Sequence, residues 1–161
     1  MSKEKKIINF WLMKSEPEVF SIDDLKKKKR WYWDGVRGYQ ARNYMRDDMC
    51  AGDMIIFYHS NANPIGPAGI ARVVRTSYPD HTQFDPTSPY FDPKATQETP
   101  RWYMVDVGFV KKFPHIISRD VLKRNSSLNG LMLWSHSRLS ITPLSETEFE
   151  TILTLTKELK T

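Results

Sequence analysis

Aromatic and hydrogen-bonding side chains of the kind that can hold a nucleobase recur along this chain. The aromatic ones are Trp33, Tyr39, Tyr58, Trp102 and Trp134, and the polar ones interspersed with them are Arg37, Arg42, Ser60, Asn61 and Arg138. An aromatic ring stacks on the face of a base with a free energy of roughly 1–3 kcal/mol, and polar groups can bind the edge of the base. Each tryptophan taken singly is also explained by packing in a core, so only the combination predicts a base-binding pocket.

The sequence lacks the residue patterns that common catalytic and cofactor sites require. Its seven glycines form neither a dinucleotide-binding nor a P-loop array, and its single cysteine cannot supply the Cys-x-x-Cys element of a zinc deaminase. The four histidines show no helical metal-ligand spacing. His59 and Ser60 are neighbours on a predicted strand, so their side chains point to opposite faces and suit binding better than catalysis. We therefore expect no metal, no cofactor and no catalytic residue, with Cys50 buried beside Met49.

The net charge of +5 is unevenly distributed along the chain. Residues 1–50 hold 12 Lys and Arg against 8 Asp and Glu, whereas the remainder hold 12 against 11. A positive surface attracts polyanions because neutralised phosphates release their counterions, so the charge favours a nucleic-acid partner. The basic run at residues 26–30 is interpreted first as a solvated helix end, where its positive charge interacts favourably with the negative pole of the helix dipole.

No apolar run approaches the roughly 20 residues of a spanning helix, and the first residues lead into no signal-peptide core. A single cysteine also favours a reducing compartment. The expected location is the cytoplasm in a bacterium or the nucleus in a eukaryote, with neither secretion nor a membrane partner.

The elements that must position these side chains follow from periodicity. A capping box at Ser21 and Asp24 predicts a helix at residues 22–29, and Ser145 with Glu148 predicts the last helix. Further helices are expected at residues 40–49 and 118–124. Apolar runs and alternation predict strands at residues 7–13, 54–58, 68–77, 101–111, 131–134 and 138–142. Length and the absence of a linker or repeat predict one domain over residues 1–161.

Residues 79–100 form a long segment without periodicity. The segment contains five of the ten prolines together with Phe84, Tyr90 and Phe91. Such segments in compact domains are usually functional or disordered. Its aromatic residues favour a segment that packs against the body of the domain.

Eight motifs in one order resemble the EVE domain family over about residues 10–155. They are WLMKSEP (11–17), FSIDDL (20–25), WDGVRGYQARN (33–43), FYHSN (57–61), YPDHTQFD (78–85), PRW (100–102), VDV (105–107) and RLSITPL (138–144). The resemblance implies an α+β, PUA-like fold: a strongly bent, mainly antiparallel β-sheet or open barrel surrounded by helices. It also implies a pocket for a modified base, with modified cytosine in DNA as the favoured ligand and without turnover.

The resemblance also suggests which residues bind the base. The pocket is expected to contain Trp33, Val36, Arg37, Gly38, Tyr39, Gln40, Tyr58, His59, Ser60 and Trp102. The rim or phosphate side is expected to contain Lys14, Ser15, Arg42, Asn43 and Arg138. Two residues depart from the family pattern, which usually has asparagine in place of Gly38 and arginine in place of His136. An absent asparagine removes a donor and an acceptor from the expected reading edge, so either a different ligand preference or a weaker pocket is expected.

Three other functions fit the same residues. The first is a reader of modified RNA, similar to YTH domains, and the second is an enzyme that acts on a nucleobase or nucleotide. The third is a module that mainly binds protein, although the sequence identifies no protein partner. Competition between RNA and DNA, turnover of a labelled base, and binding of modified oligonucleotides distinguish them.

Overall fold

The computed structural model describes residues 7–158. The strands of this part of the chain are β1 (Phe10–Ser15), β2 (Arg30–Tyr32), β3 (Met54–His59), β4 (Gly66–Pro79), β5 (Tyr103–Lys112) and β6 (Ile141–Leu144). The α-helices are α1 (Ile22–Lys28), α2 (Tyr39–Asn43), α3 (Arg119–Arg124), α4 (Met132–Ser135) and α5 (Glu146–Glu158). A π-helical turn over Tyr44–Asp48 continues α2, and short 3-10 turns cover His81–Phe84 and Ser126–Leu128.

The strands form one open sheet in the order β2-β5-β4-β3-β1-β6. The pair β1–β3 is parallel and the other four pairs are antiparallel. The register shifts between Phe57 and Tyr58 on β3 and at several points between β4 and β5, and such irregularities bend a strand. The expected α+β architecture, with a mainly antiparallel sheet that does not close, is confirmed.

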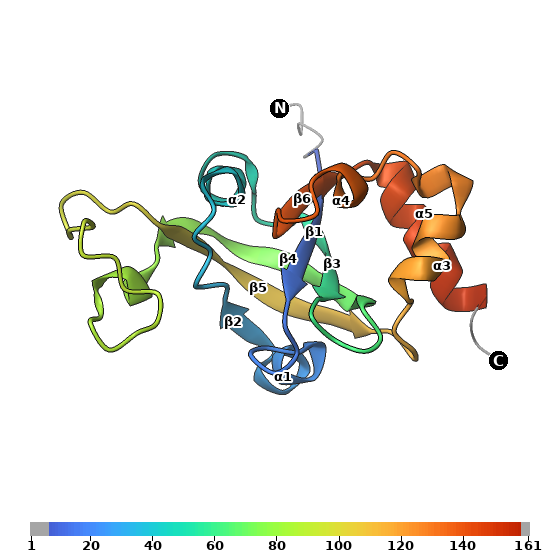
Figure 1. Ribbon diagram of the computed structural model, residues 1–161, viewed down its shortest axis with the longest axis horizontal. Coiled ribbons are helices and arrows are strands. Elements are labelled where there is room, and N and C mark those ends of the chain that lie inside the picture. The colour runs from blue at the N-terminus through green and yellow to red at the C-terminus, as the bar shows by residue number, and fades with distance from the viewer. Residues whose placement is uncertain (1–6, 159–161) are drawn as a thin grey trace, which may run out of the picture.

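Helices pack on both faces of the sheet. On one face Met13, Phe57 and Val107 pack with the buried residues of α1 and α2. On the other face Leu12 and Ile56 pack with the buried residues of α3 and α5. β1 and β3 are thus buried on both sides, which explains their nearly continuous apolar sequences. The segment after β4 projects at the end of the sheet opposite α3 and α5 (Figure 1).

Both predicted capping boxes are present. Asp24 N–H donates to Ser21 Oγ over 3.1 Å, and Ser21 N–H donates to Asp24 Oδ2 over 2.9 Å. At the start of α5, Glu148 N–H donates to Ser145 Oγ over 3.0 Å and Ser145 N–H donates to Glu148 Oε1 over 2.8 Å. These bonds satisfy amides that have no partner inside the helix, which explains where both helices begin.

Several local predictions were wrong. The strand predicted at residues 131–134 is absent from the described residues, where Met132–Ser135 form α4 and Leu131 is its N-cap residue. Leu131 and Leu133 bury their side chains in the cluster that contains α5, without strand pairing. The helix predicted at residues 40–49 becomes π-helical after Asn43, although its apolar residues Ala41, Met45 and Met49 are buried as expected.

Two further expectations need correction. The short strand β2 lies in the Trp31-Tyr32 segment, where none was predicted. Cys50 is exposed, because the chain turns outward after Met49, where Cys50 N–H donates to Asp53. No helix within residues 7–158 is long and apolar enough to cross a membrane.

Candidate nucleic-acid interface

A cavity of about 440 Å³ opens where β2 leads into the turn before α2. Five of the side chains around it are aromatic, and we call it the aromatic cavity. Its lining consists of Lys14, Ser15, Glu16, Val19, Phe20, Trp31, Tyr32, Trp33, Asp34, Gly35, Val36, Arg37, Tyr90 and Ser140. The volume lies within the range of small-ligand sites, and the mixture of rings with a few polar groups is typical of them.

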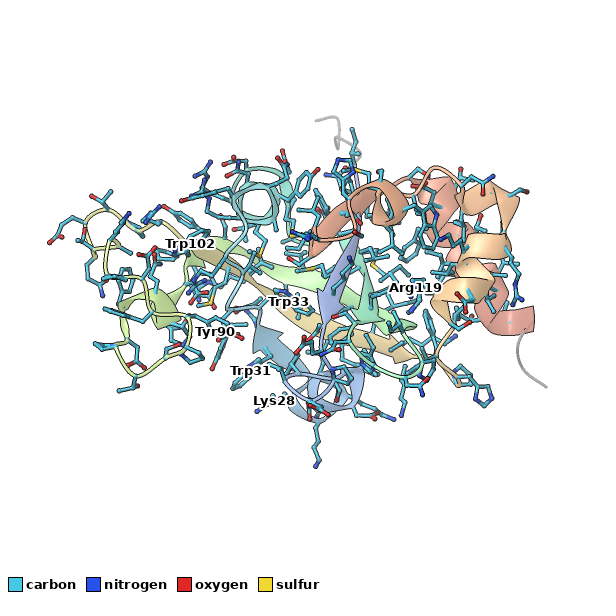
Figure 2. The ribbon with its side chains drawn as sticks, in the orientation of Figure 1. Lys28, Trp31, Trp33, Tyr90, Trp102 and Arg119 are labelled. Atoms are coloured by element: carbon cyan, nitrogen blue, oxygen red, sulfur yellow. The ribbon has the colours of Figure 1, made fainter. Side chains whose placement is uncertain are left out.

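Four separate segments bring these residues together. The end of β1 contributes Lys14 and Ser15, and the loop before α1 contributes Phe20. Strand β2 and the following turn contribute residues 31–37, and the segment after β4 contributes Tyr90. In Figure 2 Trp33 lies near the middle of the molecule, with Trp31 on the α1 side and Tyr90 toward the projecting segment.

Close packing between Gly35 and Tyr90 shapes one wall. Gly35 has a φ of +81°, and a Cβ atom there would lie 2.7 Å from Cζ of the Tyr90 ring. A side chain at position 35 would therefore meet both a strained backbone and an occupied space. Glycine allows the Tyr90 ring to lie directly on the turn.

Asp80 connects this turn to the segment after β4. Its side chain is fully buried, and it accepts hydrogen bonds from Gly35 N–H (2.8 Å), Arg37 Nη1 (3.0 Å) and Thr82 N–H (2.8 Å). Burial alone would raise the pKa of Asp80, but hydrogen bonds from Thr82, Gly35 and Arg37 outweigh it and lower the pKa. Asp80 is therefore a charged group that organises the cavity wall.

Arg37 completes the same connection. Its Nε and Nη2 atoms donate to the Tyr90 carbonyl over 3.1 and 2.8 Å, and Nη2 also donates to Thr82 Oγ1 over 3.0 Å. The guanidinium thus fixes the backbone that carries the Tyr90 ring. Because its donors are occupied in this way, Arg37 positions the cavity wall.

Asp34 is a polar group that lines the cavity. No side chain within residues 7–158 donates a hydrogen bond to its carboxylate, and the residue is only partly exposed. Burial, reinforced by the nearby Asp80 carboxylate, raises the pKa of Asp34 above its ordinary value. A carboxyl group of this kind can accept a hydrogen bond, and in its protonated form it can also donate one.

A second cavity of about 440 Å³ lies against β3 and α3, and we call it the basic cavity. Tyr58 and Ser60 line it, while Lys14 lines both cavities. In the parallel pair of β1 and β3, Lys14 stands opposite Tyr58. Neighbouring residues of a strand point to opposite faces, so Tyr58 and His59 separate.

The structure brings together some of the residues expected at the site. Trp33, Val36, Arg37, Lys14 and Ser15 all line the aromatic cavity. Trp33 is 7% exposed and packs edge-to-face on Phe57 at 5.4 Å between ring centroids, so it belongs to the core as well as to the cavity.

Other expected residues lie outside the aromatic cavity. His59 is buried and accepts a hydrogen bond from Ile22 N–H at the start of α1. Gly38 is exposed and is the N-cap residue of α2. Gln40 and Asn43 belong to α2, and the exposed Arg138 lines neither cavity.

Tyr39 and Trp102 form a separate stack on the α2 side. Their ring centroids are 5.1 Å apart with an angle of 26° between the planes, and the Arg42 guanidinium lies 4.9 Å from the Tyr39 centroid. Trp102 is the buried ring of this stack, and its Nε1 donates to Asp92 over 2.7 Å. The two rings stack on each other and lie against Arg42, while Trp102 bonds Asp92 of the segment after β4. The stack therefore anchors that segment.

Sequence reasoning missed several residues of the aromatic cavity. They are Glu16, Val19, Phe20, Trp31, Tyr32, Asp34, Gly35, Tyr90 and Ser140. The three consecutive aromatic residues at positions 31–33 were a signal that could have indicated Trp31 and Tyr32. Tyr90 could be linked to Gly35 only through the tertiary structure, because 55 residues separate them.

Known proteins resemble this chain along almost its whole length. Residues 9–155 match the family model described as the EVE domain. Human thymocyte nuclear protein 1 is 42% identical over 170 aligned residues, which cover 94% of this chain and 75% of that protein.

Solved structures show the same relationship. A hypothetical protein from Leishmania major superposes with a TM-score of 0.94 and 48% identity, covering 96% of this chain and 98% of its own. The human THYN1 protein, in a crystal structure with 5-methylcytosine-containing DNA, superposes with a TM-score of 0.87 and 42% identity, covering 92% of this chain and 98% of its own.

Proposed function

The chain belongs to the EVE domain family, and from this premise we propose that it binds DNA and holds a modified cytosine in the aromatic cavity without chemical turnover. The similar human protein was crystallised with DNA that contains 5-methylcytosine, which supports this class of ligand. The observation that carries the proposal is the Asp34 carboxyl group, which lines an aromatic cavity and receives no hydrogen bond from any side chain of residues 7–158.

The edge of cytosine is complementary to Asp34. Cytosine has an amino group that donates a hydrogen bond, and the adjacent ring nitrogen accepts one. The protonated Asp34 carboxyl group can accept from the amino group and donate to the ring nitrogen, forming two bonds at once. A raised pKa favours this protonated form, because burial disfavours the charged carboxylate.

The rings supply the remaining contacts. Tyr90, Tyr32 and Trp31 line the cavity and are only partly buried, so each ring is accessible in part. Trp31 and Tyr32 stack on each other with 4.4 Å between their centroids, which occupies one face of each ring. A base must leave the duplex stack to enter such a cavity, at a cost of a few kcal/mol that stacking and edge hydrogen bonds recover. A methyl group at C5 of cytosine adds about 0.8 kcal/mol when it is buried, or about fourfold in affinity.

Binding of matched duplexes tests the proposal. Duplexes with a single 5-methylcytosine should bind more tightly than the same duplexes with cytosine, and both bases should be recovered unchanged. Tyr90→Leu keeps apolar bulk over Gly35 but removes the planar face, and we expect it to weaken binding about tenfold. Phe91→Ala is the matched control, because Phe91 belongs to the same segment, is 38% exposed and does not line the cavity.

Two results would contradict the proposal. The first is equal affinity for modified and unmodified duplexes together with unchanged binding by a folded Tyr90→Leu variant. The second is tighter binding of a modified RNA than of the modified DNA, which would identify a reader of RNA. Conversion of the base during incubation would instead identify an enzyme.

A further inference from the structure

The basic cavity contains an excess of positive charge. Lys14, Arg119 and Lys123 line it together with one exposed carboxylate, Asp120. Of the ion pairs formed within residues 7–158, none involves any of these three cations. Lys14 is partly buried, and its burial, reinforced by the nearby Arg119 charge, lowers its pKa. An anion placed among these groups would offset both effects.

Tyr58 supplies an unused donor in the same cavity. The residue is 2% exposed, yet its hydroxyl forms no hydrogen bond with any other residue in the range 7–158. The hydroxyl oxygen itself is not enclosed, so a ligand in the cavity can reach it. Burial raises the pKa of Tyr58 to about 12, so the hydroxyl keeps its proton and remains a donor at neutral pH.

Taken together, these groups match one ligand chemistry. A phosphate group carries negative charge on several oxygens, which can accept from ammonium, guanidinium and hydroxyl donors at the same time. We propose that the basic cavity binds a phosphate group among Lys14, Arg119, Lys123 and the Tyr58 hydroxyl.

Lys14 connects this site with the aromatic cavity. Its side chain lines both cavities and donates from Nζ to the Ser137 carbonyl over 2.8 Å, which holds the ammonium group in place. If the aromatic cavity holds a base, which is the proposed function, the phosphate belongs to the backbone of the same strand. Arg119 lies toward the end of the sheet where α3 is found, and Tyr90 lies toward the other end (Figure 2).

The first arm of the test uses inorganic phosphate alone. Phosphate titrated into the isotope-labelled protein at constant ionic strength should produce saturable NMR shifts at Lys14, Tyr58 and Ser60. Arg119→Gln should abolish these shifts. Arg124→Gln should retain them, because Arg124 is exposed on the same helix but does not line the cavity. NMR shifts no larger than those that chloride produces would overturn the proposal of a phosphate site.

The second arm measures affinity for a duplex with one 5-methylcytosine. We expect Arg119→Gln to weaken binding about tenfold and to reduce the slope of log affinity against log salt by about 1. Arg124→Gln should change both values far less. Tyr58→Phe should weaken binding several-fold without changing the slope, since it removes a donor but no charge. Equal effects of Arg119→Gln and Arg124→Gln would overturn the proposal in favour of net charge alone.

The two arms together identify the source of the phosphate. Phosphate binding with unchanged DNA affinity in Arg119→Gln would point to a free phosphate compound and overturn the connection to the DNA strand. Arg119→Gln should lower affinity for methylated and unmethylated duplexes by the same factor. A native protein without preference for methylcytosine would contradict the proposed function while leaving the phosphate result valid.

Discussion

The Arg37 guanidinium lies 3.0 Å from the fully buried Asp80 carboxylate, and this ion pair joins two segments that are 43 residues apart in the chain. Asp80 also accepts from Gly35 N–H, and Arg37 donates to the Tyr90 carbonyl. These two residues therefore hold both of the segments that form one wall of the aromatic cavity. The aromatic cavity therefore depends on a buried charge that does not itself line the cavity.

Asp80→Asn is expected to destabilise the protein by about 3 kcal/mol, because the Arg37 charge loses its partner. Urea unfolding monitored by circular dichroism measures this change. Affinity for DNA should also fall, since the Gly35 turn and Tyr90 lose their connection. A variant with native stability would show that Asp80 does not carry the charge that the surrounding donors indicate.

Trp33→Ala is expected to cost roughly 3–5 kcal/mol of stability, because the ring is a buried part of the core that packs on Phe57. Loss of DNA binding in that variant would not distinguish a stacking role from a folding role. Trp33→Phe retains an aromatic ring and should remain folded. Thermal unfolding of both variants, followed by DNA titration of the folded one, separates the two roles.

Asp34 predicts a pH dependence of binding. If the protonated carboxyl group pairs with cytosine, the complex holds one more proton than the free carboxylate does. Affinity should then be highest below the raised pKa of Asp34 and should fall as pH rises through it. Protonation of Asp34 also contributes to the stability of the folded protein, and this contribution is likewise lost as pH rises through the raised pKa.

Asp34→Asn provides the matched control. An amide can accept from the cytosine amino group and donate to the ring nitrogen, as the protonated acid does, but it does not titrate. We expect this variant to retain affinity and to lose the pH dependence, whereas Asp34→Leu should lose affinity at every pH. Identical pH profiles for the native protein and the Asp34→Asn variant, measured by fluorescence anisotropy, would remove Asp34 from base recognition.

Gly38→Asn should stabilise the protein by a few tenths of a kcal/mol. Gly38 is the N-cap of α2 with φ of −89° and no side-chain capping bond, and a Cβ there would meet no atom within 4 Å. Asparagine can supply the missing cap. Since Gly38 does not line the aromatic cavity, the preference for modified cytosine should stay unchanged. A changed preference in binding assays would support the expectation that position 38 belongs to the reading edge.

DNA affinity should fall with salt, with a slope of about −0.9 for each phosphate that is neutralised. Replacement of residues 26–29 by glutamine should change this slope little. That run lies at the end of α1 and lines neither cavity, and Lys28 Nζ lies 3.8 Å from the Trp31 ring centroid. A larger effect than that of Arg119→Gln, in titrations at several salt concentrations, would place the main phosphate contact on α1.

The sequence alone determined features that depend on near neighbours. Ser21 with Asp24, and Ser145 with Glu148, specify the starts of α1 and α5 through bonds that span three residues. The apolar run of β3 specified a buried strand, because a strand covered on both faces needs apolar residues at successive positions. The family motifs also indicated the fold, and they grouped Trp33, Val36 and Arg37, which all line the aromatic cavity.

Only the tertiary structure decided which side chains share a cavity. The order of strands in the sheet places β1 beside β3, so Lys14 meets Tyr58 across 44 residues of sequence. The Arg37–Asp80 pair brings Tyr90 onto Gly35. Such contacts produce no periodic pattern in the sequence, because the residue at each position depends on a partner far along the chain. Alternation along β3 also directs His59 to the amide of Ile22 and Tyr58 to the opposite face, so Tyr58 and Ser60 line the basic cavity whereas His59 lines neither cavity.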